Sequence, residues 1–196
     1  MWIAPNISWT TGIFLALLFL FLIRKLWDQA LSRKNIRSLK DHCHVHSAAG
    51  GFPLLFATHV VFFILVPAEL LWFRRPFNLV LGSIMIAVFV LASLLRSWSI
   101  RILGEHWNSQ VVVANDMTPV VRGPYRVVRH PNYLAMCLEL IALSLAYSTY
   151  VSAVVVTLLC LVAVLVRIRR EEQALMQIPA YQEAMSGKAR LIPGIY

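Results

Sequence analysis

The chain has 196 residues, of which 59% are hydrophobic and only 14% are charged, and its mean hydropathy is +0.70. Soluble domains carry about 45–50% apolar and about 25% charged residues, so this composition excludes an ordinary soluble domain and indicates an integral membrane protein. The net charge of +9 is not accompanied by any recognition-helix, zinc-finger or single-strand-binding pattern, so we expect no nucleic-acid partner.

Apolar stretches predict an all-α, polytopic membrane bundle of about five transmembrane helices. They cover residues 9–23, 52–73, 77–95, 134–147 and 151–166. A membrane span takes about 17–25 residues, so the first, fourth and fifth stretches need flanking residues. Only Ser148, Thr149 and Tyr150 separate the last two stretches, which predicts a tight helical hairpin. Four spans are the alternative, if this hairpin is re-entrant.

Basic residues then predict the orientation of the spans. If the N-terminus lies outside, only Arg74 and Arg75 face outwards, and the other 16 of the 18 lysines and arginines face the cytoplasm. The C-terminus and two charged clusters, residues 122–133 and 167–172, are then cytosolic. We expect the bacterial inner membrane, or the endoplasmic reticulum if the source is eukaryotic.

Neither a disulfide framework nor a metal site is expected. The chain has three cysteines, and two of them, Cys137 and Cys160, lie inside apolar stretches. Residues 41–46, with the sequence DHCHVH, contain zinc-ligand types, but their alternating spacing fits neither a helix face nor a zinc knuckle. A solvated loop is therefore the main interpretation of this run.

The most informative segment is residues 122–133, with the sequence RGPYRVVRHPNY, which lies between apolar helices. It concentrates cations, tyrosines and prolines beside the bilayer, where such groups are costly unless they meet a polar ligand. Its glycine and prolines break the helix, and Pro131 suits the first turn of the next one. The free N–H groups of that turn would favour an anionic group. The segment predicts a polar small-molecule site at the membrane surface.

Two further places carry charge within apolar surroundings. Glu139 lies six residues after Tyr133, less than two helical turns deeper, where an ionisable group indicates function by default. An ion pair with a neighbouring helix is the alternative. Arg167 and Glu171 are four residues apart and share a helix face, which favours a site lined by protein over a surface ion pair.

The order of these motifs resembles the isoprenylcysteine carboxyl methyltransferase family of membrane enzymes. The resemblance rests on GPY at 123–125, RHPNY at 129–133, Arg167, the Glu-Glu pair at 171–172, Tyr181, and RLIP at 190–193. It covers about residues 104–196, whereas the first two spans match only as hydrophobic helices. The sequence departs from the family pattern at Ala135, where glycine is common, and at Ala184, where a second tail tyrosine is common.

The resemblance implies that S-adenosylmethionine is the methyl donor, bound in a cytosol-facing pocket under the C-terminal segment. By matching position, it implies cofactor contacts by Gln110, Met117, Thr118, Pro119, Val120, Tyr125, His130, Pro131, Asn132, Tyr133 and Glu171. Arg167 falls where the family places a substrate-binding arginine. For a carboxylate acceptor, Arg167 would hold the acceptor; for a phenol or enol, Glu139 or Glu171 would serve as the base. We expect one membrane domain over residues 1–196, with three helices in 1–103 and the catalytic part in 104–196.

The acceptor is expected to be lipophilic and to enter sideways between the helices. An oxygen is favoured, either the carboxylate of a prenylcysteine-like lipid acid or the hydroxyl of an alkylpyrone or phenolic lipid; a phospholipid amine is the alternative. Membrane sterol reductases, which use NADPH, carry a similar RHPNY run, but they follow it with glycine and an acid, whereas LAM follows here. A non-catalytic scaffold or lipid-binding protein is the third interpretation, and it predicts no cofactor.

Overall fold

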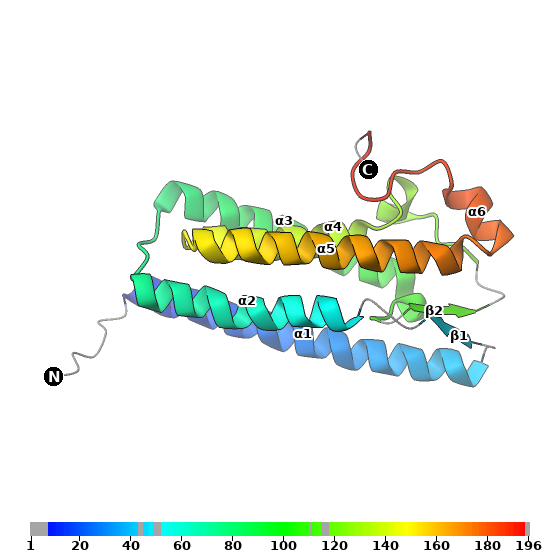
Figure 1. Cartoon of the computed structure of the whole chain (residues 1–196), viewed down its shortest axis with the longest axis horizontal. Helices are drawn as coiled ribbons and strands as arrows, with labels where there is room; N and C mark the ends of the chain where they lie inside the picture. The colour runs from blue at the N-terminus through cyan, green and yellow to red at the C-terminus, as the bar shows by residue number, and fades with distance from the viewer. Residues whose placement is uncertain (1–7, 43–44, 49–51, 110, 115–117, 195–196) are drawn as a thin grey trace.

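The computed structural model describes residues 8–42, 45–48, 52–109, 111–114 and 118–194. Its long helices are α1 Trp9–His42, α2 Phe52–Phe73, α3 Leu79–Leu103, α4 Pro131–Ala146 and α5 Tyr150–Leu175. They lie along one common axis and form an elongated bundle (Figure 1). The predicted all-α polytopic bundle is therefore confirmed.

Within the described residues, four helices are long and apolar enough to cross a membrane, namely α1, α2, α3 and α5. The fifth, α4, has 16 residues, which at about 1.5 Å per residue is shorter than the bilayer core. It is also more enclosed by protein than the others, since its buried residues include Leu140, Ala142 and Leu143. The five predicted stretches are thus four full-length helices and one short, buried helix.

The predicted hairpin between α4 and α5 is present. Ser148 adopts a positive φ of 55°, a left-handed conformation that turns the chain sharply. The side chain of Thr149 donates a hydrogen bond to the carbonyl of Ser144 over 2.6 Å, which satisfies one of the free carbonyls at the end of α4. The two helices can therefore pack side by side after a very short connection.

Several helices extend beyond the apolar stretches that predicted them. α1 continues from Ile23 to His42, and α5 continues from Val166 to Leu175. These extensions are rich in arginine, lysine, glutamine and glutamate, which are good helix formers. Hydropathy marks where a span leaves the bilayer, not where its helix ends.

A small sheet was not foreseen. β1 Val45–Ala48 pairs antiparallel with β2 Val111–Ala114, in the register Val45 to Ala114. It lies at the same end of the bundle as the short helix α6 Pro179–Met185 (Figure 1). The short helices η1 Gly104–His106 and η2 Gly123–Arg126 belong to the segment that connects α3 to α4.

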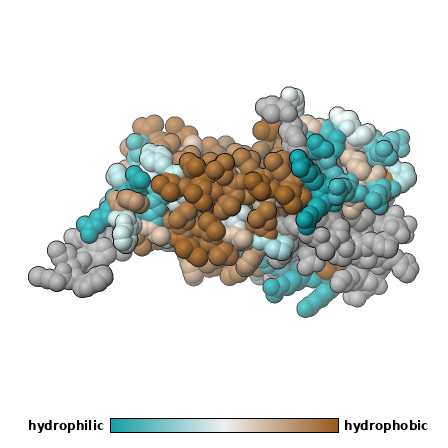
Figure 2. Space-filling view, in the orientation of Figure 1, coloured by the Kyte–Doolittle hydropathy of each residue, from teal (hydrophilic) through white to brown (hydrophobic). Residues whose placement is uncertain are grey.

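The distribution of hydrophobic and hydrophilic residues on the surface is that of a membrane protein. A hydrophobic band crosses the middle of the molecule and hydrophilic residues lie at both ends (Figure 2). Large apolar side chains exposed on the long helices include Phe19, Leu20, Ile64, Leu91, Leu94, Val154 and Leu158. An apolar surface of this extent is explained by contact with lipid.

Candidate functional site

A cavity, which we call the polar cavity, lies between the α3–α4 connection, the end of α5 and α6. It encloses about 820 Å³ of space not filled by atoms, part of it open to solvent. Its lining combines aromatic, charged and amide side chains: Leu103, His106, Trp107, Asn108, Thr118, Pro119, Val120, Tyr125, Arg129, His130, Asn132, Tyr133, Arg167, Glu171, Leu175, Tyr181 and Met185.

The structure gathers most of the predicted site residues in this cavity. Its wall contains Thr118, Pro119, Val120, Tyr125, His130, Asn132, Tyr133, Arg167 and Glu171. Pro131 is buried as the first residue of α4 and is not among the residues that line this cavity. Gln110 and Met117 lie outside the described residues.

Buried polar atoms without a hydrogen-bond partner concentrate in the polar cavity. Among the described residues they include His106 Nδ1, Asn108 Oδ1, Tyr125 Oη and Arg167 Nη1, all from lining residues. Buried polar atoms are nearly always paired, so these four indicate a ligand that offers both donors and acceptors. His106 and Asn108 were not predicted; their signal in the sequence is a polar run directly after an apolar helix.

The buried side chain of Arg167 is held by two neighbours. Its Nε donates to the hydroxyl of Tyr133 over 2.9 Å, and that hydroxyl donates to Glu171 Oε2 over 2.5 Å. Arg167 Nε also lies 3.4 Å from the same carboxylate oxygen, so the predicted helix face of residues 167 and 171 carries an ion pair. These bonds fix the guanidinium, while Nη1 has no partner within the part of the chain that the structure describes.

Glu172, which was not predicted, joins three segments beside the cavity. Its carboxylate accepts hydrogen bonds from Arg129 Nη1 over 3.0 Å, His130 Nε2 over 3.2 Å and Arg190 Nε over 2.8 Å. The backbone N–H of His130 also donates to the carbonyl of Arg190. The Glu-Glu pair is therefore divided: Glu171 faces the cavity, and Glu172 ties the tail to the RHPNY segment.

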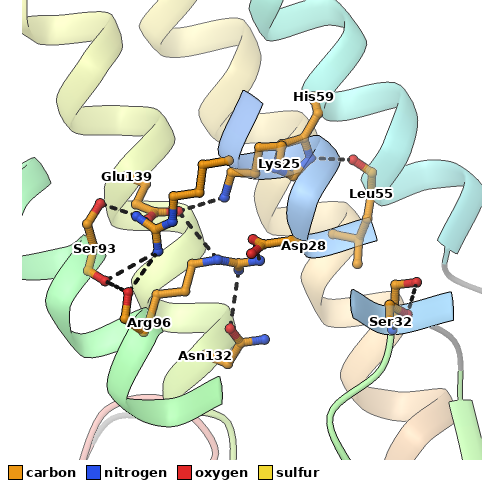
Figure 3. A network of polar contacts seen from close by, with 12 residues as sticks. Lys25, Asp28, Ser32, Leu55, His59, Ser93, Arg96, Asn132 and Glu139 are labelled. Carbon is orange, nitrogen blue, oxygen red and sulfur yellow. Dashed lines mark hydrogen bonds and ion pairs between the residues drawn. The ribbon is translucent and has the colours of Figure 1, made fainter. Parts of the chain in front are cut away.

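Glu139 lies in a buried ionic network (Figure 3) and does not line the polar cavity. Its carboxylate lies 2.7 Å from Lys25 Nζ, 3.2 Å from Arg24 Nη1 and 3.8 Å from Arg96 Nε. The hydroxyl of Ser93 donates to it over 2.9 Å. The ion-pair alternative describes this geometry, and nothing in it supports a catalytic part for Glu139.

The network reaches the polar cavity through Arg96. Its guanidinium donates from Nη2 to Asp28 Oδ2 over 2.9 Å and from Nη1 to Asn132 Oδ1 over 3.2 Å (Figure 3). Because a guanidinium only donates, it fixes the amide oxygen of Asn132 toward α3. The amide NH₂ group of Asn132 is then directed away from α3 and is available as a donor.

A second cavity, which we call the apolar cavity, lies between α1 and α2 and is bounded by α4. It encloses about 1160 Å³, and apolar side chains such as Leu22, Leu26, Phe56, Val60, Phe63 and Met136 dominate its wall. Five lining residues are shared with the polar cavity: Trp107, Asn108, Asn132, Tyr133 and Arg167. The two cavities therefore meet at the buried arginine.

This arrangement defines an integral membrane protein in which a polar ligand cavity meets a lipid-compatible one. Residues 85–177 match the model of the isoprenylcysteine carboxyl methyltransferase (ICMT) family. The segment contains Arg167, the RHPNY run and the Glu-Glu pair. Over this segment the chain is therefore similar to a family of membrane methyltransferases.

One curated relative has a similar length. The uncharacterized protein YpbQ of Bacillus subtilis (strain 168) is 29% identical over 165 residues, which cover 84% of this chain and 97% of that protein. The similarity therefore extends well beyond residues 85–177. It carries no information on the substrate.

Proposed function

We propose that this protein transfers a methyl group from S-adenosylmethionine to an oxygen atom of a lipophilic acceptor. The cofactor occupies the polar cavity and the acceptor occupies the apolar cavity. The observation that carries the proposal is the junction at Arg167, a buried arginine that lines both cavities and whose Nη1 has no hydrogen-bond partner among the described residues.

The lining of the polar cavity fits S-adenosylmethionine. The unpaired atoms of His106, Asn108 and Tyr125 can meet the hydrogen-bonding groups of an amino acid, a ribose and a purine. The Glu171 carboxylate and the tyrosine rings suit a cationic sulfonium. When bound, the cofactor supplies an activated methyl group for direct displacement, and the protein contributes by holding acceptor and donor in line.

The charge at the junction favours an oxygen acceptor over an amine. Arg167 presents N–H donors, which suit a carboxylate or another oxyanion and would repel an ammonium headgroup. A carboxylate is already ionised and needs only to be oriented. A hydroxyl acceptor needs a base to take up its proton. We assign this role to Glu171, whose carboxylate faces the polar cavity.

The polar-cavity end of the bundle faces the cytoplasm in this proposal, and the bacterial inner membrane is the location. Arg74 and Arg75 follow α2 at the opposite end of the bundle from α6 (Figure 1). The distribution of basic residues therefore supports this orientation by the positive-inside rule. S-adenosylmethionine is made in the cytoplasm, where the site would reach it.

Calorimetric titration of the detergent-purified protein with S-adenosylhomocysteine and, separately, with NADPH tests the proposal. Micromolar affinity for S-adenosylhomocysteine alone is the expected result. Binding of NADPH alone would contradict the proposal and support the reductase interpretation. Binding of neither compound would favour the scaffold interpretation.

Tyr125→Phe tests the cofactor cavity without a stability penalty. Burial raises the pKa of the Tyr125 hydroxyl, so it stays protonated and acts as a donor, yet it has no partner among the described residues. Removing it is expected to leave the unfolding temperature of the ligand-free protein unchanged or slightly higher. Affinity for S-adenosylhomocysteine should fall about fivefold to tenfold, as for one lost hydrogen bond. Unchanged affinity would remove Tyr125 from the contact.

Glu171→Gln tests the carboxylate that faces the cavity. The change keeps the shape of the side chain but removes the charge that pairs with Arg167 and faces the sulfonium. We expect the affinity for S-adenosylmethionine to fall about tenfold or more, by equilibrium dialysis. Glu183→Gln, the same change at an exposed position on α6, is the matched control and should change nothing. Equal affinity in both variants would exclude Glu171 from the pocket.

A further inference from the structure

Two polar side chains in the wall of the apolar cavity have no role in the proposed function. Lys25 of α1 and His59 of α2 both line this cavity. Asp28, Gln29 and Arg96 also line it, whereas the other lining residues of α2 are apolar. The close-up of the buried network shows both side chains, on the two helices that bound the cavity (Figure 3). A cavity that served only a hydrocarbon chain would gain nothing from these groups.

The tautomer of His59 follows from its one hydrogen bond. Nδ1 lies 2.8 Å from the backbone carbonyl oxygen of Leu55. A carbonyl only accepts, so Nδ1 carries the proton, and in the neutral ring Nε2 has a lone pair. Among the described residues no group donates to Nε2. The ring therefore offers a hydrogen-bond acceptor that needs a donor from elsewhere.

The neighbouring charges keep the ring neutral and attract electron-rich groups. The network beside it holds three cations, Arg24, Lys25 and Arg96, against the carboxylates of Asp28 and Glu139. One positive charge is in excess, so a further charge on His59 is unfavourable. Lys25 Nζ has three donors and, among the described residues, makes one hydrogen bond, to Glu139; it also lies 4.5 Å from the centre of the Phe21 ring.

Lys25 and His59 lie deeper in the membrane than Arg167, where the two cavities meet. Lys25 contacts Glu139, whereas Arg167 contacts Tyr133, six residues earlier on α4. At about 1.5 Å per residue the two levels are separated by roughly 9 Å along the helix. A group bound at His59 is thus a part of the acceptor other than the atom that receives the methyl group.

We infer that His59 and Lys25 form a second contact for the acceptor, which binds a hydroxyl group on its chain. A hydroxyl donates to His59 Nε2, and its oxygen lone pairs are favoured by the charge of Lys25. An ether or a carbonyl has no proton to donate, and an ammonium would meet the excess positive charge. This inference rests on the proposed function, because it places the reactive oxygen of the acceptor at Arg167. The substrate class is therefore a lipid with a reactive oxygen and a second, interior hydroxyl.

Palmitic acid and its monohydroxylated isomers test the inference, since the hydroxyl can be moved along the chain. Competition against a fluorescent fatty acid, with the full-length protein in micelles, gives the affinity of each isomer. We expect one interior position to bind about tenfold more tightly than palmitic acid, with weaker binding on both sides of it. His59→Phe keeps a planar ring, and it should remove this preference while palmitic acid binds as before.

Phe63→Leu, a change in the apolar wall of the same cavity, is the control and should weaken all isomers alike. A flat profile, failure of every isomer to bind, or a preference that survives in His59→Phe would overturn the inference. S-adenosylhomocysteine titration of the same samples keeps the two proposals apart. A flat isomer profile with intact S-adenosylhomocysteine binding removes the hydroxyl contact only, whereas lost S-adenosylhomocysteine binding removes the methyltransferase assignment.

Discussion

Arg167→Lys is expected to lower methyl transfer into lipid about a hundredfold while affinity for S-adenosylhomocysteine changes less than about threefold. The ammonium keeps the charge, but all its donors lie on one nitrogen, whereas Nε and Nη1 are separate donors that can meet the Tyr133 hydroxyl and an acceptor oxygen in one plane. Loss of a charged, oriented hydrogen bond in a buried site corresponds to about 1.5–3 kcal/mol. Transfer of a radiolabelled methyl group into the lipid extract of the expression host measures the effect.

Arg169→Lys is the matched control, because Arg169 is exposed two residues further along the same helix. It should behave as the unchanged protein in both assays. Equal losses of transfer and of S-adenosylhomocysteine affinity in Arg167→Lys would assign Arg167 to the cofactor instead of the acceptor. Full activity would show that the Arg167 guanidinium is not required for methyl transfer.

The residues of the polar cavity were largely predictable because they are close in sequence or regularly spaced. Tyr125 to Tyr133 lie in one segment that cannot form a continuous helix, and residues 167 and 171 share one face of a helix. The structure adds the order of their contacts, in which the Tyr133 hydroxyl stands between Arg167 and Glu171. Local sequence thus explains why these residues lie together, whereas their role as cofactor contacts was implied by the family resemblance and stays a prediction.

The remaining features depend on packing between distant helices and could not be predicted. Lys25 and Glu139 are 114 residues apart, and in the sequence Lys25 counted only as a basic residue that orients the first span. The apolar cavity forms between α1 and α2, which are apolar over most of their length and show no special pattern on the faces that enclose it. Hydropathy predicts that such helices lie in the membrane. It does not predict which of their faces pack together and which enclose a cavity.

Glu139→Gln is the substitution with the largest expected effect on stability. Three cations surround the carboxylate, and the amide that replaces it has one accepting oxygen and a donor NH₂ group that must face one of them. Breaking one side of a buried ionic network costs about 3–5 kcal/mol. We expect a clear fall in the unfolding temperature in detergent, with less folded protein recovered from the membrane.

Glu105→Gln, at an exposed position directly after α3, is the control and should unfold as the unchanged protein does. The Glu139→Gln protein that does fold should bind S-adenosylhomocysteine normally, because Glu139 lines neither cavity. Its methyl transfer per folded molecule should then fall only slightly, through the Arg96 bond that orients Asn132. A normal unfolding temperature with abolished transfer would contradict this account and return Glu139 to the chemistry, since a carboxylate that only balances charge cannot affect turnover alone.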